Sequence, residues 1–110
     1  LAEGLVLMTP FDANASDEAT QSFVAKFKEK MNGLVPNQFA ADGYDAVYVI
    51  YEAMQKAGVN DVTISASDLC AKLIPVVTGD DFTYVGATGT MTWDASGACN
   101  KVPTIVELNK

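Results

Sequence analysis

The chain has 110 residues, of which 49% are hydrophobic and 19% charged, and its formal net charge is -7. These values are typical of one modest globular domain, or a piece of a larger one, and give no sign of disorder. The acidic balance argues against nucleic acid or an anionic membrane surface as a partner, because both are bound through clustered lysine and arginine. No apolar run approaches the ~20 residues that span a bilayer.

The first predicted element is a short strand at residues 5–8, Leu-Val-Leu-Met. A continuous apolar run of this length is typical of a central strand in a parallel sheet, buried on both faces. The chain enters this strand almost at once from Leu1, without an initiator methionine, a basic segment or a cleavage motif. We therefore expect a processed chain or an excised fragment.

A helix is predicted to follow, with Ser16 as its N-cap and Asn32-Gly33 as its end. Its lysines lie towards the C-terminal end, where they complement the helix dipole, and are expected to form a solvated face. The residues predicted to form its buried stripe are Ala19, Phe23, Phe27 and Met31, with Val24 adjoining.

The most regular pattern is a long amphipathic helix that Asn37 caps and Gly58 terminates. Apolar residues recur in it at spacings of three and four, which predicts one buried face. The residues expected on this face are Ala40, Tyr44, Val47, Tyr51, Met54 and Ala57, with Ile50 beside them.

A third helix is predicted from the capping box of Ser65 and Asp68, and Pro75 should end or bend it. Its side chains expected to face inward are Leu69, Cys70, Leu73 and Ile74. Residues 79–81 are predicted to form a turn. After it the spacing of apolar residues is no longer helical: polar and apolar side chains alternate at residues 90–93, and residues 94–97 form a second turn. This pattern predicts a C-terminal hairpin with a return strand at residues 102–108.

The predicted order of strand, three helices and C-terminal β-hairpin indicates an α/β fold with too few strands. The first strand has no parallel partner within the 110 residues. We take this as a second indication of a fragment, whose sheet is completed upstream or by another copy of the chain.

No catalytic group of residues can be assembled. The chain contains no histidine, which excludes Ser-His-Asp and Cys-His arrangements. Asp42 and Asp45 lie three apart on the long helix, and we expect them to be helix-start charges that face water rather than a catalytic pair. Asp80-Asp81 is expected to be a turn, and the glycines from Gly86 to Gly89 lack the phosphate-loop pattern. We expect no enzymatic activity, no metal site and no cofactor.

Cys70 and Cys99 are the only cysteines. One interpretation is a disulfide that ties the third helix to the C-terminal hairpin, as an extracytoplasmic protein allows. The other is a buried free Cys70 with an exposed, unpaired Cys99. Sequence alone leaves both open, because it does not give the Cα separation that a disulfide requires.

Three motifs occur in an order that resembles one family. They are the strand segment E-G-L-V-L-M-T-P-F at residues 3–11, the helix start F-A-A-D-G-Y-D-A at residues 39–46, and the hairpin G-A-T-G-T-M-T-W-D-A-S-G at residues 86–97. Together they resemble the C-terminal third of the type I periplasmic solute-binding proteins of the branched-chain amino-acid (Leu/Ile/Val) ABC transporter class. The resemblance covers nearly the whole chain.

The resemblance implies a partial periplasmic-binding-protein-like fold, taken from a protein of two lobes joined by three crossovers that closes around its ligand. Residues 1–110 would then contribute segments to both lobes and to the hinge. It implies an extracytoplasmic protein, periplasmic or a cell-surface lipoprotein, whose precursor carries a signal peptide. It implies as partners a small-molecule ligand of the amino-acid class and a membrane permease.

The resemblance places the main ligand contacts of the family upstream of this chain and leaves only positions at the edge of the cleft. Phe39 and Ala41 are the ligand-binding candidates, although core packing is the alternative role for Phe39. Ala41 stands where relatives can carry a bulky aromatic. Tyr44, Asp45 and Gly89 would have structural roles, with Tyr44 and Asp45 positioning the long helix.

A second interpretation belongs to another functional class. The chain could be a small α/β interaction or sensory domain that self-associates, or swaps elements, through its unpaired strand. This alternative predicts a defined oligomer that folds without any upstream sequence.

Overall fold

The computed structural model describes residues 3–109. The expectation drawn from the start of the chain at Leu1 lies outside the described residues. The elements in chain order are β1 (Val6–Thr9), α1 (Glu18–Lys30), α2 (Gln38–Lys56), α3 (Ala66–Val77), β2 (Tyr84–Gly86), β3 (Gly89–Trp93), β4 (Cys99–Asn100) and β5 (Thr104–Glu107). The predicted α/β class and the three helices are confirmed.

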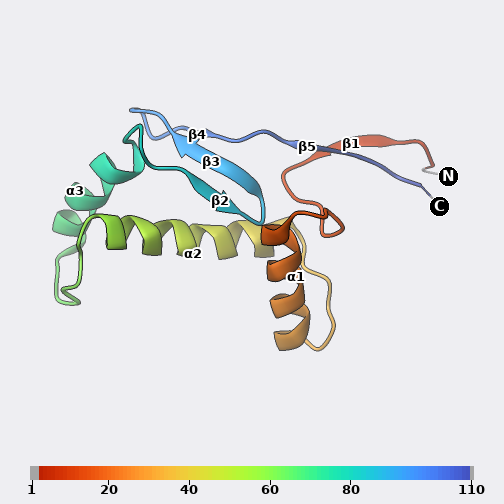
Figure 1. Ribbon diagram of the computed structural model, residues 1–110, viewed down its shortest axis with the longest axis horizontal. Helices are drawn as coiled ribbons and strands as arrows, with labels where there is room; N and C mark the ends of the chain where they lie inside the picture. The colour runs from red at the N-terminus through yellow and green to blue at the C-terminus, as the bar shows by residue number, and fades with distance from the viewer. Residues whose placement is uncertain (1–2, 110) are drawn as a thin grey trace.

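The molecule is elongated, with principal extents of 52 × 32 × 21 Å. β1 and β5 form a two-stranded antiparallel ribbon that projects from one side of the remaining elements (Figure 1). We call these two strands the ribbon, and residues 18–100 the body. In the body, the β2–β3 hairpin lies along α2, while α1 and α3 adjoin opposite ends of α2 (Figure 1).

Helix α1 begins one residue later than predicted, because Asp17 and not Ser16 is its N-cap. The Asp17 carboxylate accepts a hydrogen bond from the backbone N–H of Thr20 at 2.9 Å, which satisfies one of the donors left free at a helix start. Phe23 and Val24 are buried as expected, and Phe27 is half-buried against the core cluster, but Met31 is exposed. The predicted stripe is therefore wrong only at its C-terminal residue, Met31.

Helix α2 has the predicted ends. The Asn37 side chain accepts from the backbone N–H of Ala40 at 3.0 Å, and Gly58 takes the left-handed conformation with φ of 64°. Its predicted buried face is wrong in the middle, where Val47, Ile50 and Tyr51 are 65%, 52% and 56% exposed. Towards the two ends, Ala40, Tyr44, Met54 and Ala57 are half-buried.

The buried residues of α2 are Ala41, Asp45 and Ala53. Their small side chains, and an acid that can bond a backbone turn, allow the hairpin to approach the helix closely. The large apolar side chains consequently lie elsewhere on α2 and remain exposed in the part of the chain that the structure describes.

Helix α3 begins at the predicted cap, where the Ser65 hydroxyl accepts from the backbone N–H of Asp68 at 3.1 Å. Pro75 lies inside the helix, which ends after Val77. Proline removes one internal hydrogen bond without forbidding helical φ, so the last turn still forms. The prediction that Cys70 and Ile74 face inward is wrong, since both are exposed, whereas Leu69 and Leu73 are half-buried.

The strand predictions need the largest correction. β1 is not a buried parallel strand: it pairs antiparallel with β5, Val6 opposite Glu107 and Thr9 opposite Thr104, and Val6 and Met8 are exposed. An apolar run does not reveal the direction of its partner or what covers it. Because β1 has a partner within the chain, the alternative of self-association through an unpaired strand loses its premise.

The predicted return strand at residues 102–108 forms only as β5, which leaves the body to join β1 rather than the hairpin. The strand that returns along β3 is the earlier β4, with Cys99 opposite Trp93. The structure adds a tight hairpin of β2 and β3, turning at Ala87 and Thr88, that the alternation at residues 90–93 did not reveal.

Cys70 and Cys99 are both free and exposed. The first interpretation, a disulfide between them, therefore does not hold. The second interpretation is correct for Cys99 and wrong for Cys70, which is not buried.

The core lies where α1, α2 and the hairpin turn meet. Its cluster of buried residues is Phe11, Phe23, Val24, Ala41 and Ala87. Phe23 is its centre, with ring centroids 5.8 Å from Phe11, 5.7 Å from Phe27 and 4.7 Å from Tyr44. Over residues 3–109, none of the helices has the length and apolarity needed to cross a membrane.

Candidate functional site

Asp45 joins helix α2 to the turn of the β2–β3 hairpin. Its side chain is 2% exposed. One carboxylate oxygen accepts the backbone N–H of Ala87 at 2.9 Å, and the other accepts both the N–H and the hydroxyl of Thr88, at 2.8 and 2.6 Å. The expectation that Asp45 faces water is therefore wrong, because the turn donates the hydrogen bonds that water would otherwise supply.

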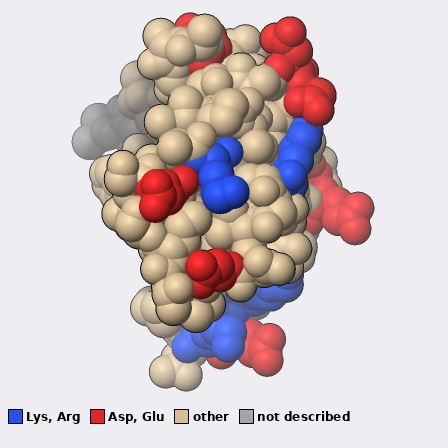
Figure 2. Space-filling model, turned by 90° about the vertical axis from the view of Figure 1, so that its left-hand side faces the viewer, with Lys and Arg blue, Asp and Glu red and all other residues tan. Residues whose placement is uncertain are grey.

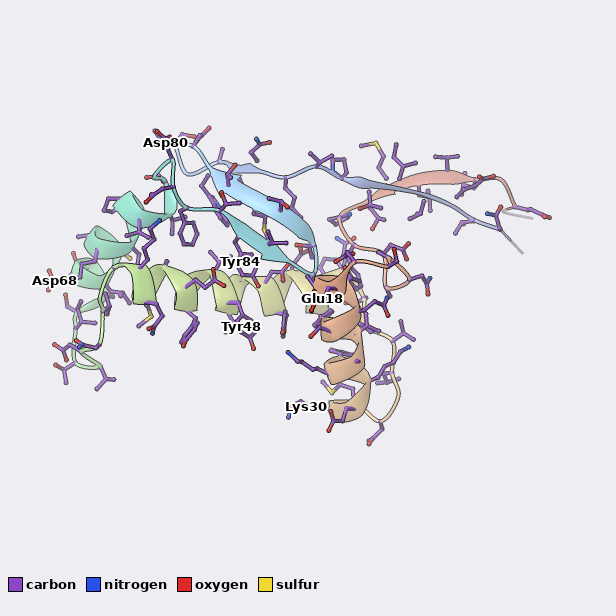
Figure 3. The ribbon with its side chains drawn as sticks, viewed as in Figure 1. Glu18, Lys30, Tyr48, Asp68, Asp80 and Tyr84 are labelled. Atoms are coloured by element: carbon purple, nitrogen blue, oxygen red, sulfur yellow. The ribbon has the colours of Figure 1, made fainter. Side chains whose placement is uncertain are left out.

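Close approach of the hairpin to α2 depends on glycine. A Cβ atom on Gly86 would collide with the Asp45 carboxylate and with the ring of Tyr84. Gly89, which follows the turn, has a φ of 106° that side-chain-bearing residues rarely adopt. Tyr84 points from β2 towards α2, whereas Tyr48 lies on the opposite side of the helix (Figure 3). Burial and then the nearby Asp45 carboxylate raise the pKa of Tyr84.

Lys101 extends this network to the segment that connects β4 with β5. Its ammonium donates to the Thr88 hydroxyl at 2.6 Å and lies 3.3 Å from a carboxylate oxygen of Asp42. The Lys101 side chain is 19% exposed. Thr88 thus accepts from Lys101 while it donates to Asp45. Neither Thr88 nor Lys101 was singled out from the sequence, because their partners lie 13 to 59 positions away.

An open hollow of about 630 Å³ lies between the ribbon and the body. One wall comes from β1 and β5, and the other from the loop after β1 and the segment before α2. The lining residues are Leu7, Met8, Thr9, Phe11, Asp12, Ala13, Asn14, Pro36, Asn37, Gln38, Phe39, Val106, Glu107 and Leu108. The hollow combines apolar side chains with amides and two carboxylates, and no Lys or Arg is among these residues.

The structure separates the two predicted ligand-binding residues. Phe39 is 75% exposed and lines the hollow, where it is free to contact a ligand. Ala41 is fully buried in the core cluster and does not line the hollow. Tyr44 is half-buried, with its ring centroid 4.7 Å from those of both Phe23 and Tyr48.

The described residues contain no group of three or more acidic, cysteine or histidine side chains placed to hold a metal ion. Figure 2 shows the face at the α3 end of the molecule, where basic and acidic side chains are interspersed among uncharged ones. The hollow beside Phe39 is the candidate binding site, because apolar and polar side chains line it together.

Comparison with known proteins agrees with the predicted resemblance. Residues 1–73 match the model of a family described as periplasmic binding protein. No curated protein matches the chain. A putative branched-chain amino acid ABC transporter protein from Rhodospirillum rubrum is 28% identical with a TM-score of 0.74; the alignment covers 99% of this chain and 29% of that one.

Two further solved structures share the fold. An ABC transporter substrate-binding protein from Desulfitobacterium hafniense, solved in complex with Leu, is 25% identical with a TM-score of 0.75, covering 98% of this chain and 30% of that one. A solute-binding protein from Rhodopseudomonas palustris, solved with 3,4-dihydroxybenzoic acid, is 23% identical with a TM-score of 0.78, covering 99% and 28%.

The chain thus spans less than a third of the length of the solved proteins that it resembles. The family model, by contrast, matches well over half of the chain. The chain belongs to the periplasmic binding protein family.

Proposed function

We propose that the chain is part of the extracytoplasmic solute-binding component of an ABC importer, which binds an amino acid or a similar small molecule by hinge closure. The observation that carries this proposal is the hollow beside Phe39, because its walls come from the ribbon on one side and the loops at the edge of the body on the other. A rotation between the two would open or close it. The importer's membrane permease would be the protein partner.

The connections between ribbon and body support a hinge. Only residues 10–17 and residues 101–103 link the two in the chain, and β1 and β5 contact chiefly each other. We therefore assign the ribbon and the body to different lobes of the complete protein, with these two segments in the hinge. On this assignment the chain contributes to both lobes and completes neither.

The lining of the hollow favours an amino acid over an aromatic acid. Asp12 and Glu107 are acidic and suit an ammonium group, while Phe39, Leu7 and Met8 suit an apolar side chain. A benzoate-type ligand brings a negative charge but no positive one, and no Lys or Arg lines the described hollow to balance it. Leucine is therefore the first ligand to test.

Replacing Phe39 by alanine tests the site directly. We expect Phe39→Ala to weaken leucine binding by about 5- to 30-fold, the loss typical of truncating an aromatic contact, while thermal stability is unchanged because the side chain is exposed. Isothermal titration calorimetry measures the affinity.

Tyr51→Ala is the matched control, since Tyr51 is an exposed aromatic on the same helix that does not line the hollow. Equal affinities of the two variants for leucine would show that the hollow is not the binding site.

A further inference from the structure

We propose that Lys101 is a positioning residue: it fixes the pivot between the ribbon and the body and thereby sets ligand affinity in the hollow without touching the ligand. The predicted effect on ligand affinity rests on the proposed function. The predicted effect on the angle between ribbon and body rests only on contacts within the chain.

The segment that carries Lys101 is the shortest route between the two parts. It consists of Lys101, Val102 and Pro103, between the end of β4 at Asn100 and the start of β5 at Thr104. Val102 is 81% exposed. Pro103 has no N–H to donate. Lys101 therefore supplies the side-chain contacts that anchor this segment to the body.

The anchor is attached to a buried, hydrogen-bonded point of the body. Lys101 donates to Thr88, and Thr88 donates to the buried Asp45 carboxylate. Asp42, one turn before Asp45 on α2, adds an ion pair at 3.3 Å. The connecting segment is thus held against both α2 and the hairpin turn, so that bending is confined to Val102 and Pro103.

The position of this anchor bears on the shape of the hollow. Lys101 does not line the hollow beside Phe39, so it cannot act there by contact. One wall of the hollow nevertheless belongs to the ribbon, whose angle to the body depends on its two connections: residues 10–17, where Phe11 is buried in the core cluster, and the shorter segment that Lys101 holds. Without the anchor the ribbon would sample more angles, and ligand binding would have to restrict them at a cost in affinity.

The first test measures the pivot itself and needs no ligand. Spin labels on the native Cys70 and on Ile105→Cys, in a Cys99→Ser background, report the distance between α3 and β5; both positions are exposed. We expect Lys101→Met to broaden the distribution of distances between the two labels, as measured by pulsed electron–electron double resonance. Asp42→Lys, at a partly exposed position, replaces attraction by repulsion and should broaden it too if Lys101→Met does not fold.

Lys56→Met is the matched control. Lys56 also forms an ion pair, with Asp81 at 2.9 Å, but at the opposite end of α2 from the connecting segment. Its removal should leave the distribution as narrow as in the unmodified protein. The inference would be overturned if Lys101→Met and Asp42→Lys gave distance distributions as narrow as that of Lys56→Met.

The second test measures affinity. Lys101→Met is expected to weaken leucine binding by about 2- to 30-fold, the range of coupling reported for residues that contact neither ligand, while Lys56→Met leaves it unchanged. Unaltered affinity in Lys101→Met would refute the effect on binding. If the unmodified protein binds no leucine, the proposed ligand fails, and the distance measurement still decides the role of Lys101.

Discussion

Replacing Asp45 by alanine is expected to lower the free energy of unfolding by about 3–5 kcal/mol. The substitution leaves the N–H groups of Ala87 and Thr88 without their acceptor in a buried position. It also removes the acceptor of the Thr88 hydroxyl and the negative charge that Lys101 approaches through Thr88. Urea denaturation followed by circular dichroism measures the change.

Two further variants distinguish the contribution of the buried hydrogen bonds to stability from the contribution of the negative charge. Asp45→Asn retains one acceptor oxygen, so we expect a smaller loss of about 1–3 kcal/mol. Asp42→Ala removes a partly exposed carboxylate from the same helix face, and such ion pairs contribute at most about 1 kcal/mol. If Asp45→Ala were no more destabilising than Asp42→Ala, the hairpin turn would not depend on the Asp45 carboxylate.

Replacing Phe23 by alanine should cost a similar amount, about 3–5 kcal/mol. Phe23 is 2% exposed and lies between the rings of Phe11, Phe27 and Tyr44. These rings come from the loop after β1, from α1 and from α2. A cavity at this point would therefore loosen the contact between three parts of the molecule, and they cannot all collapse into it.

The same denaturation measurement checks this second expectation, with Phe39→Ala as the control. Phe39 is a phenylalanine of the same chain that is 75% exposed, and its truncation should change stability by no more than about 0.5 kcal/mol. A loss below about 1 kcal/mol for Phe23→Ala would mean that the core cluster is not what holds α1 against α2.

The ends of the helices could be predicted because they depend on local chemistry. Asn37 and Ser65 cap their helices by bonding a backbone N–H three residues ahead, and Gly58 ends α2 with a positive φ. Each of these signals involves residues that are neighbours in the sequence. The one-residue error at Ser16 arose because Asp17 beside it is an equally good cap.

The middle of the buried face of α2 could not be predicted, for a physical reason. Periodicity arguments assume that the largest apolar side chains of a helix face the core. In α2 the buried residues are instead Ala41, Asp45 and Ala53. Ala41 shares the core cluster with Ala87 of the hairpin turn, and Asp45 accepts hydrogen bonds from that turn. Val47, Ile50 and Tyr51 then remain exposed.

The candidate site was predicted only in part. Phe39 was identified through a family resemblance, and the structure places it on the hollow. The opposite wall of the hollow depends on the pairing of β1 with β5, whose residues lie about a hundred positions apart in the chain. No local signal specifies such a pairing, and the contacts of Lys101 with Thr88 and Asp42 are equally non-local.

Native mass spectrometry of the protein purified from its own source, without added ligand, tests the central claim most directly. A solute-binding protein that closes around an amino acid should retain it, so we predict an adduct of amino-acid mass that is lost on mild unfolding and regained when leucine is added. A protein that carries no adduct, and gains none with leucine at a large excess, would contradict the proposed function.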